Sequence, residues 1–154
     1  MFEGNAAPTL EAAPQELVLT RVIHATRRRV FDAWTKPDQL AHWWGPDGFK
    51  LVACELDLRL GGSLHFVMRG PDGVEYPFDG HMLEVIPPAR LIFTADLGGD
   101  SGNLLLTAVT FDDHDDGTRL TVDQTVPRTE DYARGQRRGW VESLERLALF
   151  LAPN

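Results

Sequence analysis

Five histidines are the side chains in this sequence best suited to acid–base or metal chemistry. They are scattered along the chain, at His24, His42, His65, His81 and His114. No two of them have the His-Glu-x-x-His arrangement or another spacing typical of metal ligands, so the sequence predicts no metal and no cofactor. His65 alternates with Phe66 and should face water. His81 follows Gly80, which could shift the strand register, and an inward His81 could act as an acid, a base or an orienting donor.

The sequence also gives little indication of a catalytic nucleophile. Cys54 is the one cysteine, and its neighbours Ala53 and Glu55 do nothing to lower a thiol pKa, so we expect a small buried apolar residue. No serine lies in a Gly-x-Ser-x-Gly elbow, and no glycine-rich phosphate loop follows a strand. A single cysteine excludes an internal disulfide and is compatible with a reducing cytoplasm.

The acidic run 112–116 has some features of a calcium-binding loop. Counted from Asp112, however, the third position is His114 and the twelfth is Asp123 rather than a bidentate glutamate. Predicted strands rather than helices flank the run, so we interpret it as a hairpin turn.

Length and charge narrow the function classes. The 154 residues suit one domain, and the formal net charge of −8 argues against nucleic acid and anionic lipid as partners. Residues 1–15 lack periodicity and contain proline, which predicts a flexible tail before a single domain over residues 16–154. No signal-peptide pattern and no run of ~20 apolar residues is visible, so we expect a cytoplasmic protein without a membrane span.

The elements that would position a site follow from hydrophobic periodicity. Residues 17–23 alternate as a strand, Thr26 can cap a short helix, and Pro37 can open a second helix that Gly45-Pro46 ends. Alternating residues then predict six strands, at 51–58, 64–69, 74–86, 90–97, 103–111 and 118–126. A long helix should begin at the N-cap Thr129 and run to about Leu151.

This order of elements predicts an α+β fold. The long helix carries an inward stripe of Tyr132, Gln136, Trp140, Leu144, Leu147 and Leu151. A helix must bury such a stripe, and a sheet must bury one of its faces. A strongly curved antiparallel sheet of six or seven strands wrapped around the C-terminal helix meets both demands.

The inward residues could enclose a cavity, or they could form a packed core, which is the rule in proteins. Three features favour a cavity. Gly135, Gly139 and Ser143 remove bulk from one helix stripe. Met68 and Met82 are adaptable lining residues. Gln124 and Gln136 would each need a hydrogen-bond partner if buried, which a ligand, water or the other amide could supply.

The candidate cavity residues come from both helices and strands. They are Trp34, Trp44, Leu64, Phe66, Met68, Phe78, Met82, Phe93, Phe111, Val122, Gln124, Gln136, Gly139 and Trp140. The pair Trp43-Trp44 could gate the mouth of the cavity, or one ring could plug the core while the other shields the helix corner.

Several motifs occur in one order along residues 17–151. They are Phe31-Asp32-Ala33-Trp34-Thr35, Pro37, Trp43-Trp44-Gly45-Pro46, Leu56-Asp57-Leu58-Arg59 before Gly61-Gly62, Met68-Arg69-Gly70-Pro71-Asp72-Gly73, Pro87-Pro88-Ala89-Arg90-Leu91, Gly117-Thr118-Arg119-Leu120-Thr121 and Gly139-Trp140. The series resembles the family of homologues of the activator of heat-shock-protein ATPase, within the START-related SRPBCC superfamily. Leu60 departs from the family, where many relatives carry proline.

The resemblance implies a helix-grip fold with a cavity between sheet and helix. Such proteins bind apolar or amphipathic small molecules, and a minority of them are enzymes. We therefore expect a ligand-binding protein. The first alternative is an enzyme of the polyketide-cyclase kind, for which the inward polar candidates are Gln124, Gln136, Tyr132, His81 and Glu84. The second is a co-chaperone-like module that binds another protein. Val18 and Val22 on the first strand could support a homodimer.

Overall fold

The computed structural model describes residues 15–96, 104–126 and 130–153. The helices are α2 (Arg27–Thr35), α3 (Pro37–Leu40) and α4 (Glu130–Phe150). The strands are β1 (Gln15–Ile23), β2 (Lys50–Leu56), β3 (Ser63–Arg69), β4 (Glu75–Ile86), β5 (Arg90–Asp96), β6 (Leu104–His114) and β7 (Gly117–Val126). Residues 1–14 of the expected tail, and the expected N-cap Thr129, lie outside the described residues, whereas Gln15 already belongs to β1.

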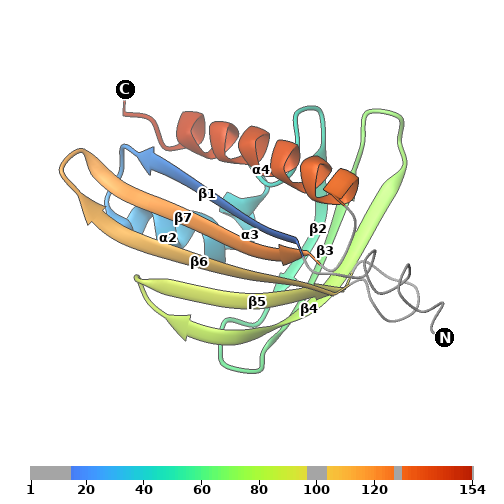
Figure 1. Ribbon diagram of the computed structural model, residues 1–154, viewed down its shortest axis with the longest axis horizontal. Coiled ribbons are helices and arrows are strands. Elements are labelled where there is room, and N and C mark those ends of the chain that lie inside the picture. The colour runs from blue at the N-terminus through green and yellow to red at the C-terminus, as the bar shows by residue number, and fades with distance from the viewer. Residues whose placement is uncertain (1–14, 97–103, 127–129, 154) are drawn as a thin grey trace, which may run out of the picture.

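All seven strands join one antiparallel sheet in the order β1-β7-β6-β5-β4-β3-β2. Figure 1 shows this sheet curving beneath the long helix α4, while α2 packs on β6 and β7 and α3 packs on α2 and β2. The buried residues of the strands and of α4 form one hydrophobic core. The predicted α+β helix-grip fold is therefore confirmed. In the described part of the chain, no helix is long and apolar enough to cross a membrane.

Two irregularities decide which strand residues face the core. The β2–β3 register shifts between Leu51 and Ala53, and Val52 there is 40% exposed. The β4–β5 register shifts between Met82 and Glu84, so buried Met82 lies opposite Phe93 before the shift and Val85 lies opposite buried Leu91 after it. A bulge adds one residue to a strand and so reverses the alternation beyond it.

The short helices begin where the sequence predicts. The hydroxyl oxygen of Thr26 accepts a hydrogen bond from the Arg29 amide at the start of α2, and Pro37 occupies the first turn of α3. Trp43 follows α3 as a fully buried plug, and its indole N–H donates to the Ala33 carbonyl at 2.9 Å. One of the two adjacent tryptophans is therefore a fully buried part of the core beside α2.

The helix α4 is held to the sheet edge and buries the predicted stripe in its C-terminal half. Trp140, Leu144, Leu147 and Leu151 are buried, while Tyr132 is partly buried against the core. On the outer side of the helix, Glu145 forms an ion pair with Arg21 of β1. Val18 of β1, one of the two valines on which the homodimer prediction rests, is 48% exposed. The homodimer stays a prediction.

Candidate functional site: a cavity between the sheet and α4

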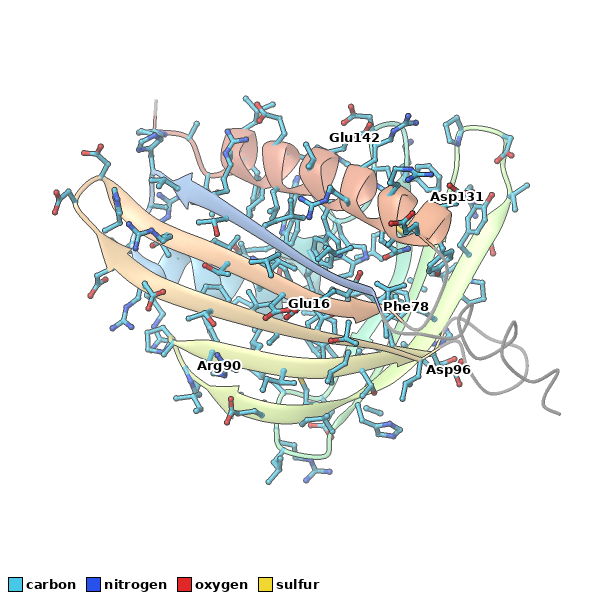
Figure 2. The ribbon with its side chains drawn as sticks, viewed as in Figure 1. Glu16, Phe78, Arg90, Asp96, Asp131 and Glu142 are labelled. Carbon is cyan, nitrogen blue, oxygen red and sulfur yellow. The ribbon has the colours of Figure 1, made fainter. Side chains whose placement is uncertain are left out.

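A cavity of about 160 Å³ lies between the N-terminal half of α4 and the concave face of the sheet. Its lining residues are Trp44, Gly45, Pro46, Met68, Phe78, Phe93, Ala95, Leu105, Thr107, Gln124, Gly135, Gln136, Gly139, Trp140 and Ser143. Figure 2 shows Phe78 on the side of the molecule where α4 begins, which agrees with its place in the lining beside Gly135. The cavity exists there because two glycines and a serine stand where α4 passes the sheet.

Eight of the fourteen candidate residues line this cavity: Trp44, Met68, Phe78, Phe93, Gln124, Gln136, Gly139 and Trp140. Four others, Trp34, Leu64, Phe66 and Met82, surround a space of only about 10 Å³ and belong to the packed part of the core. Phe111 and Val122 are fully buried elsewhere, Phe111 with its ring 5.3 Å from that of Phe31. The interior is thus part cavity and part packed core.

The four tryptophans of the chain form one aromatic cluster that makes up one wall of the site. Trp140 stacks on Trp34 at 5.7 Å between ring centroids and meets Trp44 edge-on at 5.5 Å. Trp43 lies 4.9 Å from Trp34 behind them. Edge-to-face and offset-stacked rings hold each other in fixed positions, so the wall that faces the cavity is preformed.

The polar side chains of the cavity come equally from two neighbouring strands, with Thr107 and Gln124, and from α4, with Gln136 and Ser143. Gln124 of β7 lies opposite Thr107 of β6 in the register, and its Nε2 donates to the Thr107 hydroxyl oxygen at 2.9 Å. Both side chains are buried, with Gln124 only 3% exposed. Among the described residues that line the cavity, none carries a carboxylate, imidazole, thiol, phenol, ammonium or guanidinium group.

The segment 44–49, which follows α3, covers one side of the cavity. Arg146 of α4 donates from Nη1 to the carbonyl oxygens of Gly45, Pro46 and Phe49 at 2.8, 3.1 and 3.3 Å. Glu142, labelled on α4 in Figure 2, accepts from the Asp47 amide at 3.0 Å. Two residues one turn apart on α4 therefore hold this segment closed over the site.

Comparison with known proteins now identifies the family. The sequence matches the family described as Activator of Hsp90 ATPase homolog 1-like protein over residues 24–152. The chain belongs to this family. The resemblance predicted from the motifs is therefore confirmed, and the fold is the helix-grip fold of the SRPBCC superfamily.

Solved structures agree with the assignment to the Activator of Hsp90 ATPase homolog 1-like family. A protein from Chromobacterium violaceum is 29% identical, with a TM-score of 0.78 over 90% of this chain and 98% of that one. The AHSA1 protein from Silicibacter pomeroyi is 27% identical, with a TM-score of 0.79 over 90% of this chain and 98% of that one. A protein from Nitrosomonas europaea is also 27% identical, with a TM-score of 0.78 over 88% and 93%. No protein with a curated description matches the chain significantly.

The acid–base candidates of the enzyme hypothesis, Tyr132, His81 and Glu84, are not among the described residues that line the cavity of this family member. His81 is exposed, and its backbone amide donates to the Thr94 hydroxyl. Glu84 accepts from Arg90 Nε at 2.7 Å, and the same Arg90 donates to Thr110. Figure 2 places Arg90 at the end of the sheet remote from Phe78. His65 pairs with Asp79 on the wet side of β3, as its alternation with Phe66 predicts.

Cys54 is a poor nucleophile in this fold. Burial, with a smaller contribution from Glu55, raises the pKa of its thiol to about 11. At neutral pH the thiol is therefore protonated, and only the thiolate reacts.

Alkylation of Cys54 by iodoacetamide should accordingly be slow. We expect a rate at pH 8 that is ~100-fold below that of an unstructured cysteine peptide, because the thiolate fraction falls tenfold for each unit by which the pKa exceeds the pH. The rate should keep rising as the pH approaches 11. Mass spectrometry of the alkylated chain over a pH series measures it, and a rate that levels off near pH 8.5 would show an ordinary thiol.

Replacing Arg146 with methionine should release the segment 44–49. Charge-assisted hydrogen bonds contribute about 1.5–3 kcal/mol, so we expect a loss of about 2 kcal/mol in the free energy of unfolding. Urea denaturation measures the loss. Arg137→Met is the matched control, since Arg137 is exposed on the same helix and a surface change should stay within about 0.5 kcal/mol. Equal stabilities of the two variants would contradict the assigned role of Arg146.

Proposed function

We propose that this protein binds a small hydrophobic or amphipathic molecule in the cavity between the sheet and α4. The observation that carries the proposal is the cavity itself, because native cores normally fill such spaces with side chains. Here about 160 Å³ is left open between aromatic walls, beside packed core from the same strands. Side chains that line an empty space lose their van der Waals contacts on that side, which lowers stability. A ligand that fills the space restores these contacts, so the occupied cavity is the favourable state.

The character of the walls supports binding rather than catalysis. Apolar and aromatic lining with few polar groups is typical of ligand sites. Catalysis of the polyketide-cyclase kind would require an acid or base within reach of the ligand. The described lining offers only amide and hydroxyl groups for that purpose. The proposal therefore names a binding protein, with the tryptophan cluster as its preformed wall.

Quenching of the intrinsic fluorescence by bromobenzene tests the proposal. Its bromine atom quenches a tryptophan that it touches, and Trp44 and Trp140 both line the cavity. We expect quenching that saturates with one class of site, while free N-acetyltryptophanamide shows a linear, unsaturable response. A linear response from the folded protein would contradict the proposal.

A further inference from the structure

Gln124 contains an unsatisfied polar atom inside the cavity. Its Nε2 is bonded to Thr107, but its Oε1 is buried and has no hydrogen-bond partner among the described residues. The residue lines the cavity and is 3% exposed. A buried carbonyl oxygen without a partner is rare and costly in native proteins.

The neighbouring groups show that this atom is distinctive. The other buried side-chain atoms without a partner in the described chain are Trp34 Nε1 and His114 Nδ1, and neither residue lines this cavity. The Thr107 hydroxyl already accepts from Gln124, which fixes the amide with Oε1 directed away from that bond. The cavity thus presents a hydrogen-bond acceptor held in place by its neighbour strand.

The size and charge of the site restrict what can meet that acceptor. The space measures about 160 Å³ and is partly open to solvent, so its inner part has room for about one aromatic ring, as in an apolar cavity of about 150 Å³ that holds benzene. A charged ligand would lose its hydration without gaining a partner of opposite charge, since the described lining contains no ionisable side chain. The nearby guanidinium group of Arg146 already donates hydrogen bonds to backbone carbonyl oxygens of the segment 44–49.

We infer that the ligand is a small neutral molecule, about the size of one aromatic ring, whose single hydroxyl or N–H group donates a hydrogen bond to Gln124 Oε1. This inference rests on the proposed function and specifies its ligand class. The ring lies against the aromatic walls, and the donor group determines its orientation. Gln124 is then the residue that distinguishes an aromatic alcohol or amine from the hydrocarbon of the same shape.

Three ligands of one shape test the inference by fluorine NMR. They are 4-fluorophenol, 4-fluorotoluene and 4-fluorobenzoate, which offer a donor, a methyl group and an anion at the same position. In the native protein we expect 4-fluorophenol to bind at least as tightly as 4-fluorotoluene, although the latter leaves water more readily. We expect 4-fluorobenzoate not to bind detectably.

The variant Gln124→Met keeps the length of the side chain and removes the acceptor. It should weaken binding of 4-fluorophenol about 3- to 10-fold, the value of one neutral hydrogen bond, and should not weaken binding of 4-fluorotoluene. Gln39→Met, on α3 away from the cavity, makes the same chemical change and should alter neither affinity. An unchanged ratio of the two affinities in Gln124→Met would overturn the inference.

The outcomes separate this inference from the proposed function. If 4-fluorotoluene binds the native protein tenfold more tightly than 4-fluorophenol, the cavity binds ligands but the donor bond is refuted, whether or not Gln124→Met folds. Binding of 4-fluorobenzoate as tight as that of the phenol would refute neutrality. If none of the three ligands binds, both the inference and the proposed function fail.

Discussion

Gly139→Trp is expected to abolish binding of small apolar molecules while the protein remains folded. Gly139 lines the cavity from α4, and a Cβ atom there would meet only Pro46 Cγ, at an ordinary 3.6 Å. The helix backbone therefore accepts a side chain, and an indole ring is large enough to occupy most of a 160 Å³ space. We expect the affinity for 4-fluorotoluene to fall by ~100-fold or more.

Stability should respond to Gly139→Trp in the opposite sense to binding. Replacing a helical glycine recovers part of its ~1 kcal/mol propensity cost, and filling a cavity restores lost contacts. Fluorine NMR gives the affinity and urea denaturation gives the free energy of unfolding. Val141→Trp adds the same ring at a position that is 50% exposed and should leave binding unchanged. Undiminished affinity in a folded Gly139→Trp protein would contradict the placement of the site.

Gly80→Ala is expected to cost about 3 kcal/mol or more in the free energy of unfolding. A Cβ atom at position 80 would lie 1.7 Å from the carbonyl oxygen of Thr94 and 3.1 Å from Leu64 Cδ1. Because the first of these atoms is backbone, β4 and β5 would have to separate. These two strands carry Phe78 and Phe93 of the cavity wall, so ligand binding should weaken as well.

Gly73→Ala is the matched control for the effect at Gly80. Gly73 has φ of +86° in the turn before β4, and a Cβ atom there would meet nothing within 4 Å. Its replacement should cost about 1 kcal/mol from backbone strain alone. Urea denaturation of both variants compares the two effects, and similar losses would show that the close approach of β5 does not determine the requirement for glycine at position 80.

Hydrophobic alternation was sufficient to predict the sheet and the helix. Most strand patterns have one apolar face, and the stripe of α4 marks the face that must be buried, so the fold class follows from burial. The same alternation also places on the inward faces of the strands three residues that the prediction of the cavity missed. Ala95 follows Phe93 by two, and Leu105 and Thr107 precede Val109 by four and two, so each shares an inward face.

Hydrophobic alternation could not predict which inward residues line the cavity and which belong to the packed core. Leu64 and Phe78 both face inward, yet only Phe78 meets open space, because that depends on how far the sheet has curved away from α4. A bulge bends the strand that contains it, and β4 has one before Glu84, close to where Gly80 approaches β5. Such effects involve pairs of strands rather than one sequence window.

The sequence also did not predict that the segment 44–49 covers one side of the cavity. Arg146 binds backbone carbonyls about a hundred positions earlier, and backbone groups carry no residue-specific signal. The pattern of α4 alone predicts that this arginine points its charged group into solvent. Only the fold brings its guanidinium group to this segment.

Titration with 4-fluorophenol, followed through the indole N–H signals of the four tryptophans, tests the central claim most directly. Trp44 and Trp140 line the cavity, whereas the Trp43 indole is bonded to Ala33 behind them. We predict saturable shifts that are largest for Trp44 and Trp140 and that disappear in Gly139→Trp. Signals that stay unmoved at saturating ligand, or shifts that are large for Trp43 and absent for Trp44 and Trp140, would show that the cavity is not the binding site.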